Sequence, residues 1–181
     1  MKNIFGVIIS LLLFASCNYS SSRKDQPVLY KKSGLSFMLP NKYWKIKKDR
    51  AVEGAKGIRL ISAENDEPLS KDAYLILTEI NKDLNLNSFL EKTIRSCRSS
   101  YQQRKIAFGL LDTARNIKIG NKEVLRIGFE TSIIANRNIG SITLFKLKGK
   151  TYSFMFFGEA IEAKNHQKLV DSMISSFKVD Y

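Results

Sequence analysis

The chain contains few residues of the types that build hydrolytic or metal-dependent active sites. It has one histidine, His166, and two cysteines, Cys17 and Cys97. A single histidine excludes multi-histidine metal sites and most metal hydrolase schemes. Neither G-x-S-x-G nor H-E-x-x-H occurs, and these patterns mark serine nucleophiles and zinc sites. We therefore expect no enzyme activity, no metal and no cofactor.

The histidine and the second cysteine both fall on apolar faces of predicted helices. His166 precedes Leu169 and Val170 by three and four residues, which continues an apolar stripe. A packed or capping histidine is therefore favoured over a general base. Cys97 shares a stripe with other apolar residues, which indicates a small buried hydrophobe and not a reactive thiol.

Two further segments suggest chemistry only weakly. Lys148-Gly149-Lys150-Thr151 has the end of a phosphate-binding loop, but it lacks the glycine that should precede it and it reads as a hairpin. An acidic loop over residues 64–72 offers oxygen ligands for calcium, although its spacing matches no known calcium loop. Cation binding by the loop from Glu64 to Asp72 stays an open alternative. The acidic residues of this loop are Glu64, Asp66, Glu67 and Asp72.

The amino-terminal segment has the form of an export signal. A positively charged start, Met1-Lys2-Asn3, leads into the apolar run 4–14 and the small residues Ala15-Ser16. Eleven helical residues cover only about half of a hydrocarbon core roughly 30 Å thick. We therefore expect residues 1–16 to be removed as a signal peptide and not to remain as a transmembrane anchor.

The end of this signal resembles the lipobox of bacterial lipoproteins. The matching residues are Leu13-Phe14-Ala15-Ser16-Cys17, with Phe14 at a position where leucine is more usual. The resemblance implies cleavage before Cys17, a diacylglyceryl thioether on its sulfur and acylation of the new amino terminus. The alternative is an ordinary signal peptide in which Cys17 is incidental. If Cys17 is acylated, two or three chains anchor the protein firmly in the lipid bilayer, and Cys97 remains the single thiol.

Positive charge is concentrated near this anchor. The net charge of +13 falls to +12 without Lys2, and residues 18–50 contain nine lysines or arginines against Asp25 and Asp49. Such cations favour acidic lipid head groups within a Debye length of about 8 Å. In residues 42–47, however, Trp44 alternates with lysines, as in a half-buried strand with a solvated face. Nucleic acid is not expected as a partner of an exported, tethered protein.

The remainder of the chain predicts a single domain. A composition of 44% hydrophobic and 26% charged residues excludes a disordered chain or a polytopic membrane protein. Residues 17–28 are polar and read as a lipidated tether, and residues 29–181 as the domain. Turn residues at Gly120-Asn121 and Lys148-Gly149 indicate antiparallel hairpins. The strands are predicted at residues 35–39, 44–47, 58–63, 73–80, 114–119, 125–133, 139–147 and 151–157.

Two amphipathic helices are expected among these strands. The first is indicated by an apolar stripe of Leu86, Phe89, Leu90, Ile94, Cys97 and Tyr101 at helical spacing. Ser88 and Glu91 are predicted to form its capping box. The second, over residues 163–177, closes the domain and covers a sheet face. The strand 125–133 alternates strictly, so it should cover a core on one side only. The order of strands and helices predicts an α+β fold, an antiparallel β-sheet flanked by helices.

The domain resembles the fold family of PsbP, the extrinsic photosystem II subunit, and the Mog-type Ran-binding proteins. The resembling stretches are residues 34–40 with Trp44, the meander 112–157 and the closing segment 169–179. The resemblance implies a PsbP/Mog-like αβα sandwich, a central antiparallel sheet with helices on both faces. It implies no shared catalysis, and it places no family binding residue in this sequence.

These observations favour a noncatalytic lipoprotein of the bacterial cell envelope, with the periplasmic face of the outer membrane as the favoured location. Its role would be that of an interaction or assembly module with an unidentified envelope protein partner. The alternative is a binder of an anionic ligand, such as a phospholipid head group or acidic glycan, through a basic surface. The residues assigned to that surface are Lys42, Lys45, Lys47, Lys48, Arg95, Arg98 and Arg104.

Overall fold

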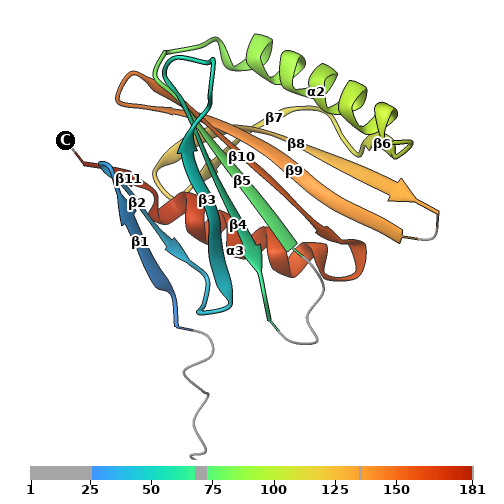
Figure 1. Cartoon of the computed structure of the whole chain (residues 1–181), viewed down its shortest axis with the longest axis horizontal. Coiled ribbons are helices and arrows are strands. Elements are labelled where there is room, and N and C mark those ends of the chain that lie inside the picture. The colour runs from blue at the N-terminus through green and yellow to red at the C-terminus, as the bar shows by residue number, and fades with distance from the viewer. Residues whose placement is uncertain (1–25, 68–72, 135, 181) are drawn as a thin grey trace, which may run out of the picture.

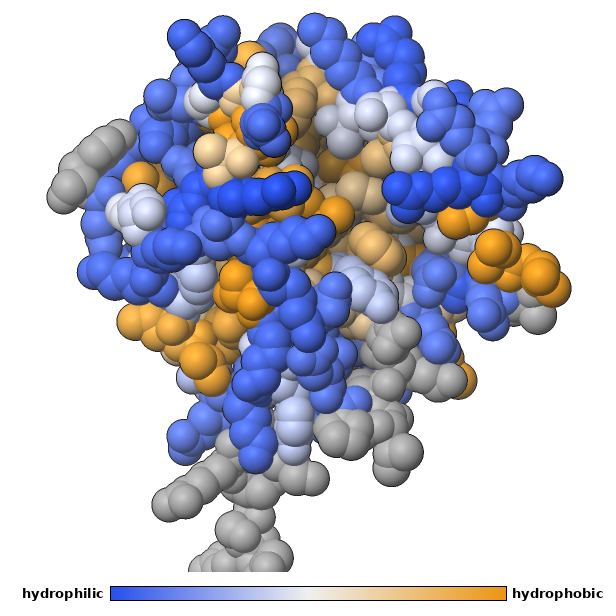
Figure 2. Space-filling view, viewed as in Figure 1, coloured by the Kyte–Doolittle hydropathy of each residue, from blue (hydrophilic) through white to orange (hydrophobic). Residues whose placement is uncertain are grey.

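The computed structural model describes residues 26–67, 73–134 and 136–180. Within them, two antiparallel sheets combine with two long helices (Figure 1). The predicted signal peptide 1–16, Cys17 and most of the tether lie outside the described residues. On the face shown in Figure 2, hydrophilic residues spread over most of the surface and hydrophobic residues occupy the gaps between them.

The larger sheet has eight strands, in the order β3-β4-β5-β10-β9-β8-β6, with β7 paired beside β6 on β8. Every neighbouring pair is antiparallel. The predicted strands are all present, and the strand 73–80 has the predicted bounds. The strands are β3 (Trp44–Ala51), β4 (Ile58–Asn65), β5 (Ala73–Ile80), β6 (Ala107–Leu110), β7 (Arg115–Ile119), β8 (Lys122–Ile133), β9 (Asn136–Leu147) and β10 (Lys150–Glu159).

The two predicted hairpins are confirmed. β7 and β8 are joined by Gly120 and Asn121, and Gly120 has a φ of 59°. β9 and β10 are joined by Lys148 and Gly149, whose φ angles are 52° and 73°. Positive φ at both central residues gives the Lys148-Gly149 turn type I′ geometry, whereas the Gly120-Asn121 turn has positive φ at its first central residue, as in type II′. Both turn types match the twist of antiparallel strands.

A smaller sheet was not predicted. It contains β1 (Val28–Lys32), β2 (Leu35–Leu39) and β11 (Lys178–Val179), with β2 in the middle. This sheet places the first and last strands of the described chain on either side of β2, and the start of β1 and the end of β11 lie at opposite ends of the sheet (Figure 1). The amide of Asp180 donates to the carbonyl of Gly34 at 2.8 Å, which extends the pairing of β11 by one residue. β11 has only two residues, too few to show a periodic pattern.

The helices are α2 (Leu86–Gln103) and α3 (Ala163–Ser176), and a short 3-10 turn, η2 (Ala160–Glu162), precedes α3. The predicted closing helix is confirmed. The predicted capping box of α2 is wrong, because the N-cap residue is Asn85. Its side-chain oxygen accepts a hydrogen bond from the amide of Ser88 at 3.0 Å. Asparagine is among the best N-cap residues, and here it displaces serine from that role.

We expect Asn85→Ala to lower the free energy of unfolding by about 1 kcal/mol, because it leaves a first-turn amide of α2 without its acceptor. Urea denaturation followed by circular dichroism measures this loss. Ser88→Ala is the matched control and should leave the midpoint unchanged. A larger loss for Ser88→Ala than for Asn85→Ala would restore serine as the cap.

The two helices cover opposite faces of the larger sheet. Along β9, Phe145 belongs to the core under α3, whereas its neighbour Leu144 belongs to the core under α2. Consecutive strand residues point to opposite faces, so both faces are buried. β8 shows the same change between Val124 and Leu125. From Leu125 onward, Leu125, Ile127 and Phe129 all belong to the core under α2, as predicted for a strand 125–133 that covers a core on one side only. Ile133, expected in that core, is exposed at the hairpin end.

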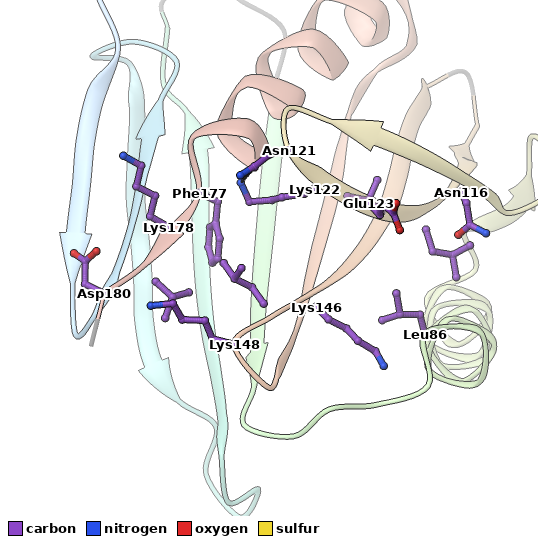
Figure 3. Close-up of a pocket in the computed structure, with 14 residues that line it drawn as sticks. Leu86, Asn116, Asn121, Lys122, Glu123, Lys146, Lys148, Phe177, Lys178 and Asp180 are labelled. Atoms are coloured by element: carbon purple, nitrogen blue, oxygen red, sulfur yellow. Dashed lines mark hydrogen bonds between the residues drawn. The ribbon is translucent and has the colours of Figure 1, made fainter.

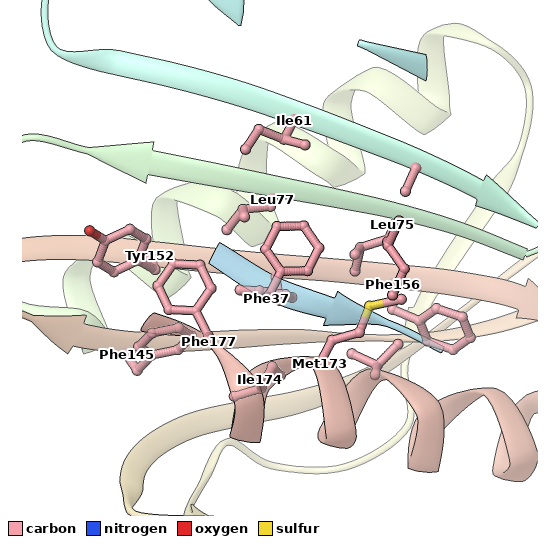
Figure 4. Packing of buried hydrophobic residues seen from close by; sticks show 14 of the residues in the cluster. Phe37, Ile61, Leu75, Leu77, Phe145, Tyr152, Phe156, Met173, Ile174 and Phe177 are labelled. Atoms are coloured by element: carbon pink, nitrogen blue, oxygen red, sulfur yellow. The ribbon is translucent and has the colours of Figure 1, made fainter. Parts of the chain in front are cut away.

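The core under α3 is built largely from aromatic rings (Figure 4). Phe177, immediately after α3, lies 4.8 to 6.2 Å from four other rings, measured between centroids. Edge-to-face and stacked pairs at such distances add to the burial of apolar area. These four partners come from β2, β9 and β10, so Phe177 joins both sheets to the helix. They are Phe37, Phe145, Tyr152 and Phe154.

A cluster of charged side chains joins the smaller sheet to the edge of the larger one. Asp49 of β3 accepts hydrogen bonds from Arg59 of β4 at 2.7 and 3.0 Å and from the hydroxyl of Tyr30 of β1 at 2.7 Å. The ammonium of Lys32 lies 2.8 Å from the same carboxylate. Arg59, above all, holds the pKa of Asp49 well below its usual range. Burial and the hydrogen bond to Asp49 raise the pKa of Tyr30 to about 12.

Candidate binding groove

A groove of 640 Å³ opens between the ends of several elements (Figure 3). Its walls come from the β7–β8 turn, the β9–β10 turn, the start of α2 and the segment that leads from α3 into β11. These elements meet because both hairpins turn back at the same end of the larger sheet. The groove therefore depends on two turns that the sequence predicted and on a small sheet that it did not.

The floor of the groove is apolar. Phe177, 1% exposed, presents part of its ring there, and Val124 and Leu147 continue the floor along β8 and β9. Leu86 from the first turn of α2 closes the far end (Figure 3). A floor of this kind favours apolar side chains of a ligand, since contact removes their surface from water.

The rim of the groove is basic. Lys122, Lys148 and Lys178 surround the ring of Phe177, and Lys146 lies farther toward Leu86 (Figure 3). Lys146 forms an ion pair with Asp83. The two carboxylates at the rim, Glu123 and Asp180, leave an excess of positive charge. The groove is therefore suited to a ligand that combines apolar groups with negative charge.

Lys122 is the most deeply placed of these lysines. It is 9% exposed, and its ammonium donates to the carbonyl of Ser175 at 3.1 Å and to the side-chain oxygen of Asn121 at 3.3 Å. Burial, assisted by the positive charge of Lys178, lowers the pKa of Lys122. Both partners are neutral oxygens, and no carboxylate of the described residues forms an ion pair with this ammonium.

The seven basic residues predicted as one anionic-ligand surface do not lie together. Lys42, Lys45, Lys47 and Lys48 lie on or just before β3, at one edge of the larger sheet. Arg95 and Arg98 are exposed on α2, and Arg104 caps its end, near β6 at the other edge (Figure 1). The positions of these residues in the sequence could not predict that one set lies at the β3 edge of the larger sheet and that the other ends near the β6 edge.

Part of the β3 set already has partners within the protein. Lys47 is 2.8 Å from Asp66 and 3.6 Å from Glu64, and these acids raise its pKa. Glu64 itself lies in β4, which extends beyond its predicted end through Asn65. Asp72 lies outside the described residues. Two of the carboxylates considered for calcium are thus paired with a lysine.

The histidine and the cysteine pack as expected. His166 is 3% exposed and makes an edge-to-face contact with Phe156, and burial lowers its pKa. Cys97 is half-buried in the core under α2, and burial raises its pKa. Within the part of the chain that the structure describes, no three histidine, cysteine or acidic side chains are grouped to hold a metal ion.

No helix formed by residues 26–67, 73–134 and 136–180 has both the length and the apolar character needed to cross a membrane. The groove lysines were not singled out from the sequence. They come from three separate segments, and each one reads as an ordinary solvated residue in its own strand or turn. The one available signal was the positive charge around the two predicted hairpin turns, where Lys122, Lys146 and Lys148 cluster.

No family model and no curated protein matches this sequence. Among solved structures, cyanobacterial PsbP (CyanoP) from Synechocystis sp. PCC 6803 is 18% identical, with a TM-score of 0.56 over 91% of this chain and 97% of that one. The Saccharomyces cerevisiae Ran-binding protein Mog1p is 9% identical, with a TM-score of 0.54 over 85% and 95% of the two chains. LpqN, involved in cell envelope biogenesis of Mycobacterium tuberculosis, is 10% identical, with a TM-score of 0.50 over 86% and 90%. The domain therefore has the α+β sandwich fold of the PsbP and Mog1p structures.

Proposed function

We propose that this protein is a noncatalytic interaction module of a bacterial cell envelope, anchored in the lipid bilayer through acylated Cys17 at the periplasmic face of the outer membrane. The groove beside Phe177 binds its envelope protein partner. The observation that carries this proposal is the make-up of the groove, an apolar floor under a basic rim. Its described lining includes no serine, threonine, cysteine or histidine that would serve as a nucleophile or general base.

Two of the similar structures support a role of this kind. Mog1p is described as a Ran-binding protein, and LpqN as a protein involved in cell envelope biogenesis. One protein of this fold thus binds a protein partner, and another acts in an envelope. Fold alone does not determine function, so the proposal rests on the groove and the lipobox, with these proteins as support.

The length of the tether limits where the partner is found. Between Cys17 and Val28, where β1 begins, a fully extended chain spans at most about 40 Å. A domain held by that segment stays close to the bilayer. The partner is therefore a protein of the same membrane surface or one that approaches it.

The anchor is tested with Cys17→Ser, which removes the sulfur that would carry the diacylglyceryl group. We expect the wild type to remain with membranes after a high-salt wash and the variant to lose that association. Cys97→Ser is the matched control and should stay with membranes, because burial and not acylation explains that residue. An unmodified amino terminus in the mass spectrum of the native protein would refute the anchor.

The groove lysines also favour a second candidate, an anionic ligand such as a phospholipid head group or acidic glycan. This site differs from the seven-residue surface predicted from the sequence. Binding of a polyanion through lysines weakens steeply with ionic strength, whereas an interface dominated by apolar contact does not. Crosslinking in native envelopes, followed by a salt series on the captured complex, separates the two candidates.

A further inference from the structure

We propose that the groove binds an extended peptide segment of a partner protein, which pairs with the free edge of β11 and places a carboxylate beside Lys122. This inference rests on the proposed function, because it names the part of the partner that the module recognises. Three observations carry it: a buried cation that no carboxylate of the described residues pairs with, the outer edge of β11 and an apolar floor between them.

The buried ammonium of Lys122 calls for an anion. An ammonium has three N–H donors, and the described residues supply two acceptors, both neutral. Holding a charge away from water without an opposite charge is costly, and a nearby carboxylate would offset that cost. Lys178 and Lys148 lie across the ring of Phe177 from Lys122, at the rim of the same groove, and add to the attraction (Figure 3).

The sheet edge follows from the register of β11. Asp180 pairs with Gly34 through its amide, so Val179, one residue earlier, is in a non-hydrogen-bonded pair with Leu35. The N–H and C=O of Val179 therefore point away from β2. β11 is the outer strand of its sheet, and Val179 lines the groove. An extended peptide can add to such an edge through main-chain hydrogen bonds.

These features favour a peptide over a lipid head group as the occupant. A sheet edge recognises the alternating N–H and C=O groups of another backbone, which a phospholipid lacks. The rim carboxylates Glu123 and Asp180 are acceptors suited to the N–H groups of a peptide backbone, which a phospholipid head group does not supply in a regular row. Side chains of an added strand alternate in direction, so apolar residues reach Phe177 while acidic residues meet the lysines.

The test uses a fluorescein-labelled, terminally blocked peptide of alternating leucine and glutamate, with the purified native protein and fluorescence anisotropy as the readout. We expect saturable binding that falls at least tenfold, about 1.4 kcal/mol, when glutamine replaces glutamate, since hydrogen bonds to charged groups are roughly twice as strong as neutral ones. Lys122→Met should weaken binding by a similar factor. If the Lys122 variant fails to fold, Lys178→Met serves as the test, because Lys178 is exposed and its replacement should not disturb folding. Lys178→Met should also weaken binding of the glutamate peptide.

Lys45→Met is the matched control, since this exposed lysine lies on β3 away from the groove, and its affinity should equal that of the wild type. Equal binding of the glutamine and glutamate peptides would overturn the inference. So would binding of phosphatidylglycerol vesicles or inorganic phosphate that depends on Lys122 while the peptide does not bind. Membrane release of the wild type would refute the anchor and leave this inference intact, whereas failed peptide binding with an intact anchor refutes only the groove assignment.

Discussion

Phe177→Ala should lower the free energy of unfolding by about 4 kcal/mol, a large part of the total stability of a domain this size. The ring is 1% exposed and contacts four other aromatic rings that belong to both sheets. Its removal deletes apolar contact and leaves a cavity at the junction of α3 with β11. Thermal and urea denaturation of the purified domain measure the loss.

Two further variants show whether the loss in Phe177→Ala comes from the buried aromatic ring. Phe177→Leu retains most of the buried volume and should cost much less than the alanine variant. Ile161→Ala removes a large apolar side chain that is 82% exposed, in the turn before α3, and should be nearly neutral. Similar losses for Phe177→Ala and Ile161→Ala would mean that the aromatic cluster does not hold the helix and sheets together.

Asp49→Asn should lower the free energy of unfolding by about 3 kcal/mol, because it removes the charge that Arg59 and Lys32 share. The Asp49 side chain is 7% exposed and that of Arg59 is 15% exposed, so solvent screens this pair weakly. After the change, the carboxylate that remains near Arg59 among the described residues is that of Glu79, at 3.6 Å. Lys47→Gln, which breaks an exposed ion pair, is the matched control and should leave the denaturation midpoint unchanged.

The same carboxylate predicts how stability depends on pH. The folded-state pKa of Asp49 is depressed, so its contribution is complete above the unfolded pKa of about 3.9 and is lost as the pH falls toward the folded value. The wild type should therefore lose stability steadily below about pH 5. The Asp49→Asn variant should show a shallower decline over the same range. Parallel pH profiles for the two proteins would contradict the role assigned to Asp49.

Much of the fold could be predicted because strands and helices leave different periodic patterns. Ala73–Ile80 alternates and ends at turn residues, and the stripe from Leu169 to Phe177 has helical spacing. The hairpin at Lys148-Gly149 was visible because its two residues suit a type I′ turn. Local patterns of this kind survive in the folded protein whenever tertiary packing agrees with them.

The failures also have physical causes. Ser88 looked like a helix cap because the capping-box pattern is local, but Asn85, three residues earlier, has the extended backbone and the side chain that reach the free amide. β8 begins at Lys122, three residues before its predicted start at Leu125, and the added residue Val124 packs in the core under α3. β11 is specified by its partner β2, 142 residues away at the pair Lys178 and Ser36, and not by its own two residues.

The candidate site was predicted least well. The resemblance to a lipobox lies in consecutive residues that end at Cys17, so it can be recognised from the sequence alone. The groove is assembled from four distant segments, three of which supply its lysines, and each lysine alone resembles any surface lysine. The predicted basic residues fall into two sets, one on or just before β3 and one on α2 or at its end, and their separation could not be predicted because it depends on how the strands are ordered in the sheet.

The edge position of β1 has a mechanical consequence. Tension applied to the chain before Val28 would act first on β1. Among the described strands, β1 is hydrogen-bonded to β2 only. The contacts from Tyr30 and Lys32 to Asp49 connect β1 to β3 of the larger sheet. Under force applied from its amino-terminal side, the domain should therefore unfold in steps. The contacts to Asp49 should set the force at which β1 separates first.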